Sequence, residues 1–163
     1  MAQRDNEGQH TDSGFTLIEL AVVILIIGIL ISFAMVSYLG VKKNAQFKSA
    51  QSSARTAFIH AKAYYGALDS FQGVTVSVLN AAETTSTFVA TASTGPQVVS
   101  FEVTGVRYDV FTAAVYSPAG RCYYGQEGAD GVLRKFFVDM STNTACVADT
   151  TNFAAAALVN NPW

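Results

Sequence analysis

Residues 20–41 read LAVVILIIGILISFAMVSYLGV, a stretch without a single charged side chain. A helix rises about 1.5 Å per residue, so these residues would cover roughly 33 Å, which is enough to cross the hydrocarbon core of a bilayer. The rest of the chain never repeats such an apolar run. The sequence therefore predicts one membrane span followed by one water-exposed body.

The composition limits what that body can be. The chain has 163 residues, of which 50% are hydrophobic and 13% are charged, so the water-exposed part has room for one domain with a packed core. The composition argues against intrinsic disorder, because disordered chains have few apolar residues and many like charges. The net charge of −2 gives no general attraction to nucleic acid, and we do not expect nucleic acid as a partner.

Helical spacing continues beyond the span. Apolar residues recur three or four positions apart at Phe47, Ala50, Ala54, Ala57, Phe58, Ala61, Tyr65 and Leu68. No proline occurs before Pro96, so one helix can run from about Phe15 to Tyr65, a length of about 75 Å. Its first half is apolar all round and its second half has one apolar stripe, which predicts that only the second half lies against a globular head.

Beyond Gly66 the pattern becomes that of a sheet. Apolar and polar residues alternate over 99–104, and residues 107–116 (RYDVFTAAVY) are rich in β formers. Residues 117–120 and the pair Asp130-Gly131 predict turns, the second as a two-residue hairpin turn. We expect three or four antiparallel strands, with a short helix near 78–83 in the connection 69–97. The predicted fold is α+β, a long N-terminal helix packed on a small antiparallel sheet.

A hexapeptide, GFTLIE at residues 14–19, stands between the polar residues 1–14 and the apolar run. Here the sequence resembles the type IV pilin and pseudopilin family, whose signature is a short polar leader ending in Gly, then Phe-Thr-Leu-Ile-Glu, then a long apolar segment. The resemblance is close over residues 14–40. The run Ser93-Thr94-Gly95-Pro96, with the cysteine pair, is similar to pilins of Gram-positive bacteria.

The resemblance implies a route to the cell surface. A prepilin peptidase would cut between Gly14 and Phe15 and methylate the new amino group of Phe15. Other pilin subunits and the pilus assembly machinery are the further expected partners, with the plasma membrane before assembly and a surface pilus after it. The chain would divide into a cleaved leader (1–14), a transmembrane and filament-core segment (15–41), an amphipathic helix half (42–66) and a head (67–163).

Glu19 needs a physical explanation because it lies at the start of the apolar run. A carboxylate in hydrocarbon costs at least about 2.5 kcal/mol, so an unpaired one should be rare. The resemblance implies that Glu19 pairs with the Phe15 amine of a neighbouring subunit and sets the stagger of the filament. Position alone also allows a glutamate at the membrane interface, exposed at the start of a helix.

Two features depart from the family. Many pilins have a proline in the region where Val36 stands here, so we expect a smooth helix. Lys42, Lys43 and Lys48 follow the span while the leader is net acidic, and the positive-inside rule would place these lysines in the cytoplasm. The family requires the opposite orientation, which we follow because its motif is more specific than a charge count.

The only two cysteines are Cys122 and Cys146, and an even count in a secreted domain favours a disulfide. Closing this loop should contribute about 3 kcal/mol in the chain-entropy model, and the resemblance agrees with the pairing. Two free buried thiols are the alternative.

The acids and histidines give little support for a metal-binding or catalytic site. We expect solvated turn acids rather than a calcium site, because the head lacks the dense oxygen ligands of a calcium loop; the acids concerned are Glu127, Asp130, Asp139 and Asp149. His10 and His60 are too isolated for zinc. No catalytic residue, metal or cofactor is expected, and we do not expect an enzyme.

The helix also carries a basic stripe. Lys48, Arg55 and Lys62 are spaced to share one face, with no acid between Glu19 and Asp69. A solvated face, a contact with acids of an adjacent subunit, and binding of DNA are all open.

Three functions are compatible with the sequence. The first is a structural subunit of a type IV pilus-like filament. The second is a pseudopilin of a type II secretion system, and the third is a membrane-anchored binding or sensor domain, for which Ser32 and Ala34 would offer a small-x-small cleavage site.

Overall fold

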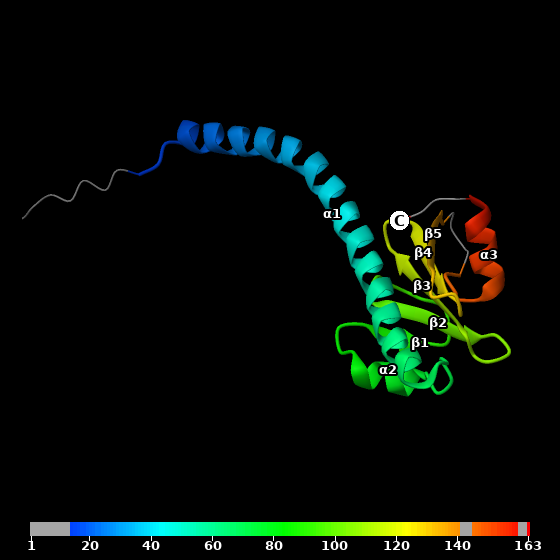
Figure 1. The fold of residues 1–163 in the computed structure, drawn as a ribbon. Helices are drawn as coiled ribbons and strands as arrows, with labels where there is room; N and C mark the ends of the chain where they lie inside the picture. Colours follow the sequence, from blue (N-terminus) through cyan, green and yellow to red (C-terminus); the bar gives the residue numbers. More distant parts are fainter. Residues whose placement is uncertain (1–13, 141–144, 160–162) are drawn as a thin grey trace, which may run out of the picture. The chain divides into compact units, whose positions relative to one another are not determined.

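The computed structural model describes residues 14–140, 145–159 and 163. Figure 1 shows the elements in chain order: α1 (Leu17–Leu68), α2 (Val76–Ala82), β1 (Thr87–Val89), β2 (Val98–Thr104), β3 (Val110–Ser117), β4 (Arg121–Glu127), β5 (Leu133–Asp139) and α3 (Thr150–Val159). The chain divides into two compact units, Met1–Gly40 and Val41–Trp163. The predicted long helix and the α+β class are confirmed.

The first unit contains the N-terminal part of α1 and no other element among its described residues. An 18-residue window of this helix has a mean hydropathy of 2.9 and none of it is buried in the protein, so by length and composition it can cross a membrane. Its polar residues are few. The Ser32 hydroxyl donates to the Gly28 carbonyl one turn back, at 2.9 Å, so this polar group needs no outside partner.

The second unit contains a five-stranded sheet in the order β1-β2-β3-β4-β5. Strands β2 to β5 pair antiparallel, as predicted, and each follows its neighbour in the chain. The prediction of three or four strands was too low, because β1 was missed. That strand has three residues and pairs parallel with β2, and so short a segment gives no readable alternation.

The main core lies between the second half of α1 and one face of the sheet. Alanines at positions 50, 54, 57 and 61 are buried and let the helix approach the strands closely. Phe58 packs edge-to-face on Phe111, with ring centroids 5.4 Å apart. A Cβ on Gly125 would lie 2.5 Å from the Phe58 ring, so only glycine fits there. Leu68 is 62% exposed, so the predicted stripe ends one turn earlier.

The opposite face of the sheet carries a second, smaller core. Its buried members are Ala114, Cys122, Tyr124, Cys146, Ala148 and Phe153. Phe153 belongs to α3, which begins after Asp149, whose carboxylate accepts the Asn152 backbone N–H at 2.6 Å as a helix cap. No clear pattern predicted the structure of this tail, and the Asp149 cap is the signal that was available.

Only one of the two predicted turns has the expected form. At the β3–β4 turn Gly120 has φ 94° and its N–H donates to the Ser117 carbonyl, as in a three-residue hairpin. The prediction of a two-residue turn at Asp130-Gly131 is wrong, because five residues, 128–132, separate β4 from β5. Asp130 instead accepts the Val132 N–H at 3.1 Å, and the pair closes the end of a wider loop.

Candidate functional site

The Gly14–Phe15 peptide bond lies in non-helical chain just ahead of α1. Phe15 is 86% exposed, and among the described residues nothing lies within 4 Å of a Cβ built on Gly14. An enzyme can therefore reach this bond without unwinding the helix. The geometry puts the predicted cleavage dipeptide at an accessible position.

Thr16 and Glu19 form a capping box at the start of α1. The Glu19 Oε2 atom accepts the Thr16 backbone N–H at 2.9 Å and the Thr16 hydroxyl at 2.7 Å. In return the Thr16 hydroxyl oxygen accepts the Glu19 N–H at 3.3 Å. These bonds satisfy donors that a helix N-terminus otherwise leaves unpaired. Sequence reasoning missed Thr16, although T-x-x-E before an apolar run is the signal of this motif.

The capping box uses only one oxygen of Glu19. Among the described residues no donor contacts Oε1, and the Glu19 side chain is exposed. Together with Phe15, Ile18, Val22 and Val23 it lines a shallow apolar groove of about 340 Å³. This arrangement combines one free carboxylate oxygen with an apolar surface, and a cation carried on an apolar group would fit both.

One turn further along, a second shallow groove of about 450 Å³ lies on the same helix. Small residues form its floor between larger aliphatic ones: Ala21, Ile24, Leu25, Gly28, Ile29 and Ser32. Small side chains let helix backbones approach each other closely in apolar surroundings. This face is therefore suited to another helix.

The family described as prokaryotic N-terminal methylation motif matches residues 10–35. This segment is a prepilin-type signal. The match includes Gly14, Phe15 and Glu19, and it confirms the resemblance on which the sequence analysis relied. No curated protein and no solved structure matches the chain significantly.

A prepilin signal has direct consequences for the chain. It implies cleavage by a prepilin peptidase and assembly into pilus-type filaments, and it supports a type IV pilin-like or pseudopilin protein. Proteins with this motif are structural rather than catalytic. The apolar first half of α1 fits membrane anchoring before assembly.

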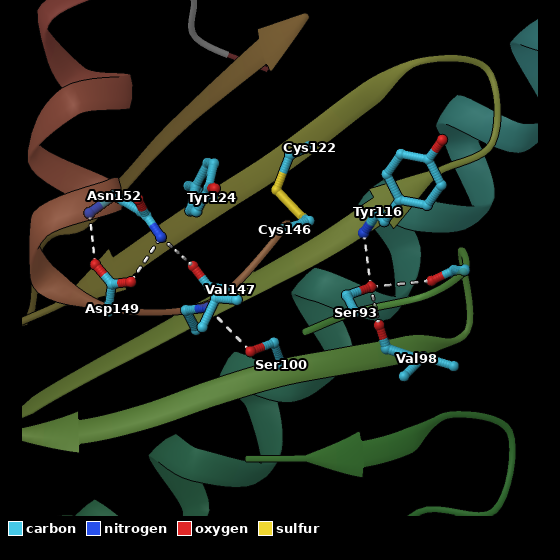
Figure 2. Close-up of a disulfide and its surroundings, with 12 residues drawn as sticks. Ser93, Val98, Ser100, Tyr116, Cys122, Tyr124, Cys146, Val147, Asp149 and Asn152 are labelled. Atoms are coloured by element: carbon cyan, nitrogen blue, oxygen red, sulfur yellow. Dashed lines mark hydrogen bonds between the residues drawn. A yellow bond between two sulfur atoms is a disulfide. The ribbon is translucent and has the colours of Figure 1, made fainter. Parts of the chain in front are cut away.

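Cys122 and Cys146 are joined in a disulfide on the far face of the sheet, with Cα atoms 5.7 Å apart (Figure 2). Hydrogen bonds also hold the chain around Cys146 to the sheet, on both sides of the disulfide. The Ser93 N–H donates to the Cys146 carbonyl at 2.8 Å, and the Ala148 N–H donates to the buried Ser100 hydroxyl at 2.9 Å. The disulfide is thus one of several attachments of residues 145–149 to the sheet.

The four acids that were considered as calcium ligands each have a separate partner. Asp130 pairs with Arg134, Asp139 with Arg121, and Asp149 caps α3. Glu127 is 5% exposed and pairs with Lys62 at 2.9 Å, so the expectation of a solvated acid was wrong at this position. Within the described ranges no three His, Cys, Asp or Glu side chains come together, and His10 lies outside those ranges.

Glu83 and His60 tie α2 to the long helix. His60 Nε2 lies 3.1 Å from a Glu83 carboxylate oxygen. The hydroxyl and backbone N–H of Thr85 also donate to Glu83, and these bonds lower the pKa of the carboxyl to about 2. His60 therefore has a structural contact in the head.

Arg121 is a residue whose role the sequence did not reveal. Its guanidinium lies between the rings of Phe47 and Phe137, at 4.5 and 4.3 Å from their centroids. Asp139 accepts its Nε–H at 2.7 Å, and this hydrogen bond raises the pKa of Arg121. The stack joins the second half of α1 to β4 and β5.

Proposed function

We propose that the chain is a structural subunit of a pilus-type filament that is cut between Gly14 and Phe15, methylated on Phe15 and polymerised through its N-terminal helix. The observation that carries this proposal is the methylation motif over residues 10–35, with Glu19 at the start of an exposed apolar helix. Prepilin peptidase, further copies of the chain and an assembly machinery are its partners.

The exposed apolar surface supports polymerisation through the helix. Large aliphatic side chains between Leu17 and Val41 are about half exposed or more, from 46% at Val23 to 87% at Leu17. Lipid covers such a surface while the subunit is in the membrane. Outside the membrane the same surface is stable only against other apolar groups, at about 25 cal/mol per Å² buried. Neighbouring copies of the same helix supply those groups in a filament.

Glu19 gives this association a register. Cleavage creates a cationic amine on Phe15, and the amine of one subunit can enter the apolar groove of its neighbour and meet the free Oε1 of Glu19. Pairing offsets the cost of each charge in apolar surroundings. Oε2 meanwhile keeps the capping box of its own helix, so the two roles of Glu19 are compatible.

The intact mass of protein sheared from the surface of native cells tests this proposal. We expect one chain that begins at Phe15 and carries one methyl group. Protein that begins at Met1, or just after Ala34, would contradict the proposal and favour a membrane-anchored sensor or binding domain.

A further inference from the structure

Three cations surround an apolar groove on the head. The groove has a volume of about 330 Å³ and lies between α1 and the β4–β5 hairpin, lined by Arg55, Phe58, Ile59, Lys62, Glu127, Leu133 and Lys135. Ile59 is 67% exposed within it. Glu127 neutralises Lys62, and among the described residues Arg55 and Lys135 have no acidic partner. This basic groove therefore combines an apolar floor with a net positive rim.

An apolar tip with acidic flanks lies at the end of α1. Val106, in the β2–β3 loop, is fully exposed. Asp109 ends the same loop and Asp69 follows the last residue of α1, and Arg107 is the single cation of these two segments. The last turn of α1 has no basic residue, so its negative dipole end adds to the acidic character. We name residues 68–69 and 105–109 the acidic knob.

The acidic knob is held in shape before any partner arrives. The Phe71 N–H donates to the Tyr108 carbonyl at 2.8 Å, and the Ser70 hydroxyl donates to the Arg107 carbonyl at 2.8 Å. The Tyr108 N–H also donates to the Gly105 carbonyl, which closes the loop on itself. A preformed loop loses little conformational freedom when it binds, which favours affinity.

We propose that the basic groove of one copy receives the acidic knob of a second copy in the filament, an inference that rests on the proposed function. Val106 would cover Ile59 and Leu133, while the knob carboxylates approach the cations of the rim. The two surfaces match in both charge and apolar character, and such complementarity selects partner and register.

Membrane insertion restricts how the two copies can be related. All copies enter the membrane in one direction, so their α1 helices run parallel. Ile59 in the groove and Leu68 in the acidic knob are separated by nine residues of one helix, or about 14 Å. The neighbour must therefore be displaced along the helix axis, and the contact joins two different surfaces. Such a heterologous contact repeats into an open filament.

Cysteine cross-linking of intact filaments tests the contact. Cells would co-express the full chain as two variants, Ile59→Cys and Val106→Cys, and sheared filaments would be mildly oxidised and separated on a non-reducing gel. We expect a covalent dimer from the mixture and none from either variant alone. Thr94→Cys, at an exposed position elsewhere on the head, replaces Val106→Cys as the matched control and should give no dimer with Ile59→Cys.

Charge reversal supplies a second, independent measurement. Arg55→Glu should lower the yield of filaments several-fold, and adding Asp109→Lys should restore part of it. Lys48→Glu, on the same helix but outside the groove, should leave the yield unchanged. The amount of membrane-bound subunit is measured in each strain, so that a folding defect is separated from an assembly defect.

Each failure has its own meaning. Filaments of methylated subunits that give no mixed dimer would overturn the knob-and-groove contact and leave the proposed function standing. A dimer from Ile59→Cys alone would overturn it in favour of symmetric packing. Loss of binding to labelled duplex DNA in Arg55→Glu, with normal assembly, would make the groove a polyanion site instead. Wild-type cells without any filament of this chain would refute the proposed function itself.

Discussion

The two halves of α1 are one continuous helix but obtain their stability in different ways. Residues 17–40 are all exposed, whereas the second half buries six side chains: Ala50, Ser53, Ala54, Ala57, Phe58 and Ala61. All of these except Ser53 belong to the core against the sheet. The first half is aliphatic on all sides and the second has one face of small residues. The second half therefore packs within the chain, while the first needs lipid or other copies of the same helix.

Gly14→Val should have the largest effect, because it prevents the first half of α1 from leaving the membrane. The protease must accommodate the residue before a large phenylalanine, and a branched side chain leaves little room there. We expect the full-length chain to accumulate in the membrane with no filaments, as measured by intact mass and electron microscopy. Gly14→Ala should be cut slowly. Normal processing of Gly14→Val would show that the cut lies elsewhere.

Glu19→Gln separates the two roles of Glu19. Glutamine can also occupy the N3 position of a capping box, so the start of α1 should persist. The charge is lost, and removing one partner of a buried ion pair typically costs about 3 to 5 kcal/mol, a penalty repeated at every added subunit. We expect filaments to disappear while membrane-bound monomer remains, by fractionation and electron microscopy of sheared material.

Thr16→Ala is the matched control for Glu19→Gln. It removes the cap, worth about 1 kcal/mol, and keeps the carboxylate. Filaments should still form from Thr16→Ala in reduced amount. Abundant filaments from Glu19→Gln would show that capping is the only role of Glu19.

The sequence predicted the parts of this comparison that depend on long patterns. The apolar run, the helical stripe and GFTLIE extend over many residues, and each was sufficient to place its element. Contacts between distant residues had no such signal. Nothing in the sequence indicated that Glu127 would be buried against Lys62, or that Arg121 would lie between two aromatic rings, because both depend on the register of β4 and β5 against α1.

Cys122→Ser with Cys146→Ser should destabilise the head and leave the first half of α1 unaffected. The bridge spans a sequence separation of 24 residues, and its loss should cost about 3 kcal/mol in the chain-entropy model. The head should still fold, because hydrogen bonds from Ser93 and Ala148 also hold the segment. Non-reducing peptide mapping of the wild type and urea unfolding of both chains check this. Two alkylatable thiols in surface protein would contradict the bridge.

Gly125→Ala tests how closely the second half of α1 packs on the sheet. The added methyl group meets the Phe58 ring at 2.5 Å, and overpacking of this kind costs about 1 to 3 kcal/mol. Gly66→Ala makes the same chemical change in α1, where no atom of the described part of the chain lies within 4 Å, and should stabilise the head by up to about 1 kcal/mol. Urea midpoints of the two variants should therefore move in opposite directions. Equal midpoints would mean that the helix and sheet are less tightly packed.

The smallest expected effect is the response of the head to acid through Glu83. Hydrogen bonds from Thr85 and the contact with His60 lower the pKa of this carboxyl to about 2 from an ordinary value of 4.5. A lowered pKa contributes stability above the unfolded value, so this contribution is complete above about pH 4.5 and is lost as the pH falls toward 2. The urea midpoint should therefore fall more steeply over this interval in the wild type than in Glu83→Gln. Thr85→Val removes the hydroxyl that contributes most to the lowered pKa of Glu83. In this variant the fall of the urea midpoint should end at a higher pH. If Glu83→Gln followed the wild-type curve, the acid response of the head would come from its other carboxylates.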